Sequence, residues 1–375
     1  MDAEVAIIGL GAMGSAVAWT LARSGVRVMG LDAGPHPGHD LGSSHGESRI
    51  IRQAYFEHPA YVPLVREAWA LWQRLQNESG RQLLVKTGGL MIGGRDAEVV
   101  QGAIESARAH SLTYEVLNRS VMQRRFPQFR LHPDEVAVYE PMAGLVRPEE
   151  GVRAFVQEAL ARGADLRFGS RVIAIEAEEG AVRVRTVATT IRAERAIVAA
   201  GAWTGHLVCN RWPLQVERQV QLWFSVAGPA RFGPARSPIF IRQAPDGRQY
   251  YGFPSLDGTT VKVALHHGGA GVEPDELPRA VTEEDWKPAL QAVKELIPDL
   301  VGPPVRAAVC MYTNSPDGHF IVGPHPDRPA LTVLAGFSGH GFKFAPAIGR
   351  LAADLVKGNG AVLPLFDPTR FSGRD

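Results

Sequence analysis

Residues 4–14 decide the fold, and they read Glu-Val-Ala-Ile-Ile-Gly-Leu-Gly-Ala-Met-Gly. The first five form a short apolar run that predicts a buried parallel strand. A helical pattern follows to about Ser24, and residues 26–32 predict a second strand that ends in Asp32. Strand, glycines, helix and strand in this order predict a βαβ unit in an open α/β sheet of the Rossmann type.

The glycines and the terminal acid of this unit predict a dinucleotide site. Gly9 permits a tight turn, Gly11 lets the backbone approach a pyrophosphate, and Gly14 allows the helix to pack closely on the strand. The helix N-terminus offers free N–H groups to phosphates, and Asp32 is placed to accept a hydrogen bond from a ribose hydroxyl. The pattern predicts an ADP-containing cofactor and leaves FAD and NAD both open.

The composition suits a globular protein. The 375 residues, 45% of them hydrophobic, predict one large or two moderate domains. The formal net charge of +1 argues against nucleic acid or an anionic membrane as a partner. No apolar run approaches the length of a membrane span, and the start Met-Asp-Ala-Glu lacks the basic and apolar parts of a signal peptide. We therefore expect a soluble cytoplasmic protein.

Cysteine and lysine are both scarce. The two cysteines, Cys209 and Cys310, are too few for a disulfide framework and form no Cys-x-x-Cys pair, so no metal site is expected. On composition alone, each is a small buried hydrophobe. Six of the 40 basic residues are lysines. Codon bias explains this scarcity, but the few lysines also become candidates for sites that need a compact ammonium group.

Three pairs of residues stand out by their spacing. Arg49 and Arg52 would share a face on a helical turn and could hold a carboxylate, although a solvated basic turn fits the spacing equally well. Lys262 shares a strand face with His266, and Cys310 shares one with Tyr312, because strand side chains alternate. An outward-facing charge is the alternative for Lys262.

The remaining pattern predicts two sheets. Helices are expected over residues 61–77, 97–111, 148–162, 284–296 and 347–355. A strand pair is expected over residues 83–94, with a turn at Gly88-Gly89, and further strands over 165–168, 171–178, 181–186, 190–192, 196–200 and 331–335. The strand 196–200 runs into Gly201, a second place where backbone can close on a cofactor. Strands at 216–224, 239–241, 250–253, 260–266 and 306–313 predict a second, mainly antiparallel sheet.

The chain resembles the family of monomeric sarcosine oxidase and N-methyltryptophan oxidase, within the D-amino-acid-oxidase-like flavoproteins. The resemblance covers nearly the whole chain. Its landmarks are residues 9–14, 46–55, 250–254, Lys262 with His266, 310–313 and 336–344. It implies a Rossmann-type FAD-binding domain (1–82, 145–212 and 315–375) interleaved with a mainly antiparallel α+β substrate domain (83–144 and 213–314).

The resemblance also implies residue roles. FAD would be joined through its 8α-methyl carbon to the sulfur of Cys310. Arg52 and Lys343 would pair with a substrate carboxylate, and Lys262 would activate O₂ near flavin N5. The other implied residues line the flavin or shape the substrate pocket: Ser43, Arg49, Tyr55, Gly201, Tyr251, His266, Tyr312, Gly339, Gly341 and again Lys343. Arg49, His266 and Tyr312 would act with Lys262 in catalysis.

The implied activity is oxidation of an N-methyl amino acid such as sarcosine by O₂, giving the demethylated amino acid, formaldehyde and hydrogen peroxide. A monomer is expected. The alternatives are a cyclic imino-acid oxidase or dehydrogenase on the same fold, an NAD-dependent dehydrogenase, and a non-enzymatic flavin module. The chain departs from the family pattern at Ser44, where the family has a histidine. An inward-facing Arg242 would favour a substrate with a polar or acidic side chain. The sequence leaves open the preferred side chain, the oligomeric state and the physiological electron acceptor.

Overall fold

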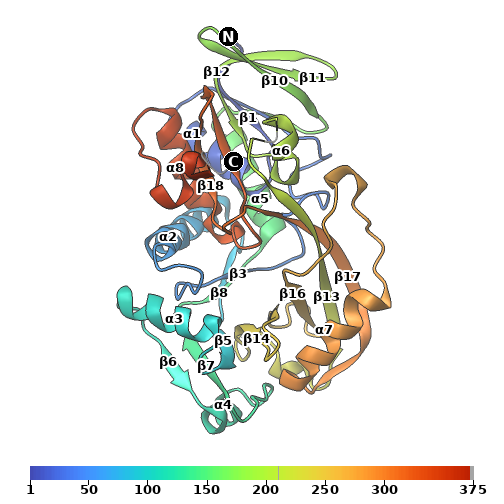
Figure 1. The fold of residues 1–375 in the computed structure, drawn as a ribbon. Helices are drawn as coiled ribbons and strands as arrows, with labels where there is room; N and C mark the ends of the chain where they lie inside the picture. The colour runs from blue at the N-terminus through green and yellow to red at the C-terminus, as the bar shows by residue number, and fades with distance from the viewer. Residues whose placement is uncertain (210, 372–375) are drawn as a thin grey trace.

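The computed structural model describes residues 1–209 and 211–371, whose strands form three sheets (Figure 1). The first sheet has the order β10–β11–β12–β1–β2–β9, and β19 pairs with β12 and with β18. Its strands are β1 (Ala3–Ile8), β2 (Val28–Leu31), β9 (Asp165–Arg167), β10 (Val172–Glu178), β11 (Ala181–Thr186), β12 (Thr190–Val198), β18 (Ile321–His325) and β19 (Arg328–Ala335). β1 lies parallel to β2 on one side and to β12 on the other. The predicted βαβ unit is confirmed.

Helices cover one face of this sheet. They are α1 (Ala12–Arg23), α5 (Pro148–Leu160) and α8 (Ala345–Val356), and α1 packs against both α5 and α8. The helix α2 (Tyr61–Ser79) packs against α5 and α8. A Cβ added at Gly349 of α8 would lie 2.7 Å from the backbone of Ala16, so this glycine lets α1 and α8 approach closely. The aromatic rings of Trp19, Trp72 and Phe155 fill the core beneath them.

The second sheet is mainly antiparallel, as predicted. Its order is β17–β13–β16–β15–β14–β5–β7–β6, and all neighbours are antiparallel except β14 and β5. The strands are β5 (Gly89–Gly94), β6 (Glu115–Leu117), β7 (Glu135–Glu140), β13 (Gln215–Val226), β14 (Ile239–Gln243), β15 (Gln249–Gly252), β16 (Thr260–His266) and β17 (Leu300–Asn314). The other helices are α3 (Glu98–Ala109), α4 (Arg119–Arg125), α6 (Thr204–Leu207) and α7 (Glu283–Leu296), and α3 and α7 pack against this sheet.

A small third sheet consists of β3 (Arg49–Ile51), β8 (Gly144–Val146) and β4 (Leu84–Lys86). It corrects two predictions. Residues 83–94 are not a strand pair, because β4 joins this sheet and β5 joins the second one. Arg49 and Arg52 do not share a helical turn, because Arg49 begins a strand.

Other differences concern short or partly exposed elements. The two strands predicted at 190–192 and 196–200 are one strand, β12, whose exposed charged residues pair with β11 before its apolar end becomes buried. The elements β6, α4, β7, β8 and β18 were not predicted, because three to seven residues carry little periodicity. Within the described residues, no helix is both long and apolar enough to cross a membrane.

Candidate active site

A cavity of about 750 Å³ opens at the carboxyl ends of β1 and β2 and reaches the end of β17. The structure brings eight predicted cofactor-site residues to its walls, together with Tyr312, which was predicted to shape the substrate pocket. The eight are Gly9, Gly11, Asp32, Ser43, Arg49, Gly201, Gly339 and Gly341. An open α/β sheet binds its ligand at this edge.

The glycine turn has the geometry of a phosphate cradle. Gly9 has a φ of +92°, and a Cβ there would lie 2.5 Å from the carbonyl oxygen of Ala199. Gly14 lies behind the cavity, where a Cβ would lie 1.8 Å from the carbonyl oxygen of Gly9. At Gly11, by contrast, the nearest atom is the hydroxyl oxygen of Ser44 at 3.5 Å, so the backbone here is accessible to a ligand.

Asp32 organises the turn around the cavity. Its carboxylate accepts hydrogen bonds from the backbone N–H of Leu10 (2.6 Å) and of Gly34 (2.7 Å), and lies 3.1 Å from Nε2 of His39. Burial raises the pKa of Asp32, but the bonds from His39 and the two backbone groups outweigh it, so the pKa is lowered. A carboxylate has about four acceptor sites, which leaves room for the predicted ribose contact.

Lys262 lies beneath residues 46–48, the loop that leads into Arg49. Its buried ammonium group donates to the carbonyl oxygens of Gly46 (2.6 Å) and Ser48 (2.9 Å). Burial lowers the pKa of Lys262 well below its usual range, and the nearby charge of Arg49 lowers it further. The guanidinium of Arg49 in turn donates to Gln221 (3.3 Å). The predicted outward-facing alternative for Lys262 is wrong, because its side chain is buried.

The predicted carboxylate clamp of Arg52 and Lys343 also contains an acid, Glu57, that was not predicted from the sequence. Arg52 donates from Nη2 to both oxygens of Glu57 (2.5 and 2.7 Å) and stacks over the ring of Tyr55. Lys343 donates to the carbonyl oxygen of His340 (2.6 Å) and to the hydroxyl of Tyr55 (3.3 Å).

Electrostatics couple the members of the clamp. Burial, with the charge of Arg52 adding to it, lowers the pKa of Lys343 to about 7. Burial favours the protonated form of Glu57, but Arg52 and other neighbours prevail and lower its pKa to about 2. Glu57 is therefore an anion, and Lys343 sits close to its titration point at neutral pH.

Three aromatic residues group on the second sheet. Nδ1 of His266 lies 3.2 Å from the hydroxyl of Tyr312, and the ring of Tyr251 packs edge-on against His266 at 6.2 Å. Burial lowers the pKa of His266 well below its usual value, so the ring is neutral. A second cavity, of about 810 Å³, extends from His266 to Glu57 and His340.

Cys310 is buried on the same strand face as Tyr312, but does not itself line the first cavity. The neighbouring Met311 does line it, and the carbonyl oxygen of Met311 accepts a hydrogen bond from the hydroxyl of Ser43 (2.7 Å). Cys209, by contrast, is exposed.

Arg242 does not have the expected position. Its buried guanidinium donates to Glu135 (2.8 Å) and to the carbonyl oxygen of Ala292 in α7 (2.9 Å). It thus faces the core under α7, and the prediction that it would select an acidic substrate is wrong. On a strand the preceding residue points the other way, and Ile241 is the one packed beside Tyr251.

Residues 4–355 match the family model described as FAD dependent oxidoreductase. The chain is 42% identical to monomeric sarcosine oxidase of Streptomyces avermitilis over 98% of both chains. This protein belongs to the FAD-dependent oxidoreductase family. It is also 34% identical to N-methyl-L-tryptophan oxidase of Salmonella newport, over 99% of this chain and 98% of that one. The structure of L-proline dehydrogenase from P. horikoshii superposes with a TM-score of 0.85 at 22% identity, over 99% of this chain and 98% of that one, which confirms the predicted fold.

The buried polar atoms around Arg49 fit the family's cofactor. Within residues 1–209 and 211–371, Nε2 of His45 and Nε2 of Gln221 are buried without a hydrogen-bond partner. Burial lowers the pKa of His45 to about 4, so its ring is neutral and has one donor and one acceptor nitrogen. Leaving buried polar groups unpaired is costly, and a flavin ring carries both carbonyl oxygens and ring nitrogens that would pair with them.

Proposed function

We propose that this protein oxidises N-methyl amino acids, sarcosine or a larger relative, and that water then releases the demethylated amino acid and formaldehyde, while O₂ is reduced to hydrogen peroxide. FAD, when bound, accepts the two electrons of the C–N bond oxidation. The observation that carries the proposal is the buried clamp of Arg52 and Lys343 beside His266 and Tyr312.

The charge of the clamp suits one carboxylate. Arg52 and a protonated Lys343 contribute two positive charges, and Glu57 contributes one negative charge. Within the described residues, Nε of Arg52 is buried without a partner, so the guanidinium retains a donor while its Nη2 stays on Glu57. A bound carboxylate would complete both groups and hold the amine of the substrate in one orientation.

In its protonated form, Lys262 supplies a second fixed charge. Its ammonium group is held by the carbonyl oxygens of Gly46 and Ser48, which orient it without neutralising it. We assign it to dioxygen, because a preorganised cation stabilises negative charge that develops on oxygen as it is reduced.

We further propose that FAD is attached to the sulfur of Cys310. Cys310 is buried beside Met311, whose carbonyl Ser43 holds at the cavity wall. Denaturation in acid tests the link: flavin should stay with the precipitated wild-type protein and be released from Cys310→Ser. Flavin that washes out of both proteins would contradict the link and leave the oxidase proposal intact.

A substrate panel tests the activity. Sarcosine and larger N-methyl amino acids should yield equal amounts of formaldehyde and peroxide, whereas dimethylamine, which lacks the carboxylate, should not react. Peroxide from proline or pipecolate alone would favour the cyclic imino-acid alternative, and reduction of a dye without peroxide would indicate a dehydrogenase. Gel filtration tests the expected monomer, and cell fractionation tests the expected cytoplasmic location.

A further inference from the structure

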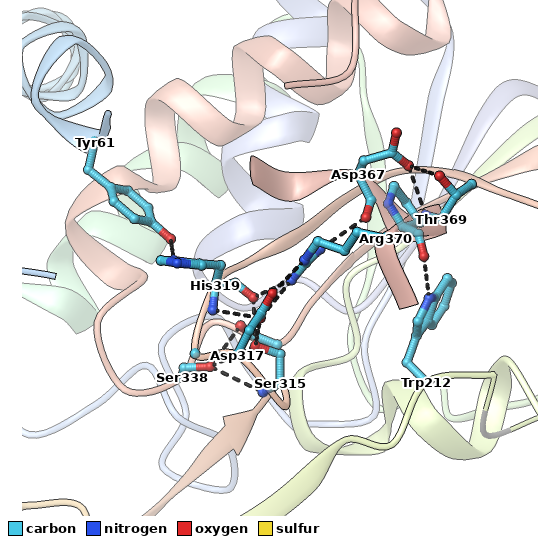
Figure 2. A network of polar contacts seen from close by, with 12 residues as sticks. Tyr61, Trp212, Ser315, Asp317, His319, Ser338, Asp367, Thr369 and Arg370 are labelled. Carbon is cyan, nitrogen blue, oxygen red and sulfur yellow. Dashed lines mark hydrogen bonds and ion pairs between the residues drawn. The ribbon is translucent and has the colours of Figure 1, made fainter. Parts of the chain in front are cut away.

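The C-terminal segment reaches a loop that borders the clamp. Residues Pro364–Phe366 and Pro368–Phe371 form two short 3₁₀ turns, and Phe366 packs with Tyr61 and Phe320 in the core. The indole N–H of Trp212 anchors the segment by donating to the carbonyl oxygen of Pro368 (2.9 Å). Figure 2 shows how this anchor presents Arg370 to the loop of residues 315–319.

Arg370 binds this loop through most of its donors. Its guanidinium donates from Nε and Nη2 to the two oxygens of Asp317 (2.8 and 3.0 Å), and from Nη2 to the carbonyl oxygen of His319 (2.9 Å). The side chain of Arg370 is 15% exposed, so water screens this fork only in part. Asp317 also accepts from the backbone N–H of His319 (3.0 Å), which tightens the turn.

The loop fixes the tautomer of His340. The carbonyl oxygen of Gly318 lies 3.0 Å from Nε2 of His340 and can only accept, so Nε2 carries the proton. Burial lowers the pKa of His340 to about 4, so the ring is neutral and Nδ1 is an acceptor. The hydroxyl of Tyr55, 2.6 Å from Nδ1, must therefore donate to it.

The direction of the hydrogen bond between Tyr55 and His340 determines whether Tyr55 can accept a hydrogen bond from Lys343. Because Tyr55 donates its proton to His340, its oxygen is free to accept from the ammonium group of Lys343 at 3.3 Å. Lys343 donates a second bond to the carbonyl oxygen of His340. An ammonium group has three donors, so these two bonds aim the third.

We propose that Arg370 is a positioning residue for substrate binding, acting through Asp317, Gly318, His340 and Tyr55 on the orientation of Lys343. The proposal deepens the proposed function, because it rests on Lys343 binding the substrate carboxylate. Without Arg370 the loop of residues 315–319 loses the guanidinium hydrogen bonds to Asp317 and His319. The carbonyl group of Gly318 then no longer fixes one tautomer of His340. As a result, Tyr55 is free to turn its hydroxyl proton toward Lys343.

The test compares Arg370→Gln with Arg350→Gln in the FAD-loaded protein. Arg350 pairs with Glu67 and Asp354 at the α2–α8 contact and does not contact the loop of residues 315–319, so it controls for a lost ion pair. The ligand is methoxyacetate, which resembles sarcosine with an ether oxygen in place of the amine. Its Kd should rise about tenfold in Arg370→Gln and stay unchanged in Arg350→Gln, because a misaligned charged hydrogen bond loses part of its energy.

A second readout is independent of ligand and flavin. Long-range ¹H–¹⁵N correlation spectra of histidine-labelled protein, assigned with His340→Asn, should show the Nε2–H tautomer in the wild type and a mixture in Arg370→Gln. Arg370→Lys keeps the charge without the fork and should fall between them. Asp317→Asn should reproduce the effect, and the double variant should be no worse than either single one.

The outcomes separate the two proposals. If Lys343→Met leaves the Kd of methoxyacetate unchanged, the clamp itself is wrong. If Lys343→Met weakens binding but Arg370→Gln changes neither the Kd nor the tautomer, Arg370 is only a structural tie and the positioning role is wrong. Should Arg370→Gln fail to fold, the same two measurements on Asp317→Asn decide.

Discussion

Carboxylate ligands are expected to bind this protein more weakly as the pH rises above about 7. Burial and the charge of Arg52 lower the pKa of Lys343 to about 7, so the free protein loses this proton near neutrality. A bound carboxylate favours the ammonium form and raises that pKa. The affinity is therefore full below the pKa of the free protein and falls as the pH passes through it.

The size of the effect follows from that pKa. Two pH units above it, at about pH 9, protonating Lys343 costs ~2.7 kcal/mol, which corresponds to about hundredfold weaker binding than at low pH if the clamp requires the ammonium group. At about pH 8, a site with a pKa of about 7 should take up about 0.9 proton for each ligand bound. The neighbouring Glu57 and His340 have pKa values lowered to about 2 and about 4, outside this window.

Titration calorimetry with methoxyacetate, in two buffers of different ionisation enthalpy, measures the proton uptake directly. Methoxyacetate has no amine, so the ligand itself does not titrate in this range. Lys343→Met is the control: binding should be weaker at every pH, and the slope above about pH 7 should disappear. A wild-type Kd that is constant from about pH 6 to about pH 9, or a slope that survives in Lys343→Met, would refute the assignment of the proton to Lys343.

Three further predictions concern other parts of the molecule. Lys262→Met should slow re-oxidation of the flavin by O₂ by about 10²–10³-fold, because it removes a preorganised charge. Reduction of the flavin by substrate should change far less. Stopped-flow measurements that show equal effects on the two half-reactions would contradict this. Arg242→Met should lower the free energy of unfolding measured in urea by about 3–5 kcal/mol, because it leaves the Glu135 carboxylate buried without an ion-pair partner. The KM for substrate should stay unchanged. The double variant with Glu135→Gln should recover part of the lost stability if the unpaired carboxylate is the cause. Gly14→Ala should lower the flavin content of the purified protein, because the new Cβ would lie 1.8 Å from the carbonyl oxygen of Gly9. Gly94→Ala is the control and should leave the flavin content unchanged, because open space surrounds that position.

The sequence was sufficient where a structural feature is local. The βαβ unit could be predicted because strand, turn and helix lie within residues 3–31 and each has its own pattern. The shared faces of Lys262 with His266 and of Cys310 with Tyr312 follow from alternation along one strand. The same alternation did not reveal whether a face is inward, and for Arg242 the wrong side was expected.

The parts that could not be predicted are contacts between irregular segments. Glu57 lies five residues after Arg52 in a loop, where no period says which side chains meet. The carbonyl of Gly318 reaches His340 across 22 residues, between two loops. A backbone carbonyl has no residue signature at all, so no sequence pattern could reveal this bond.

The correction at Arg49 and Arg52 changes how the site is understood. On a helical turn the two guanidinium groups would have met and formed one anion site. Arg49 instead begins the strand β3, and Arg52 lies just beyond the end of that strand. Arg49 lies with Lys262, and Arg52 lies with Lys343.

Each buried lysine is thus next to an arginine that lowers its pKa, an arrangement that costs free energy. In the clamp, the single negative charge of Glu57 offsets only one of the two positive charges. Each Arg–Lys pair also has a buried nitrogen donor nearby that lacks a hydrogen-bond partner among residues 1–209 and 211–371. These donors are Nε2 of Gln221, beside Arg49, and Nε of Arg52. We infer that the two Arg–Lys pairs mark two places for negative charge: one where it develops, as electrons reach the cofactor and dioxygen, and one where it arrives with the substrate carboxylate. A substitution in one pair should then affect one half-reaction. Lys262→Met is therefore expected to change the reaction with oxygen, and Lys343→Met is expected to change substrate binding.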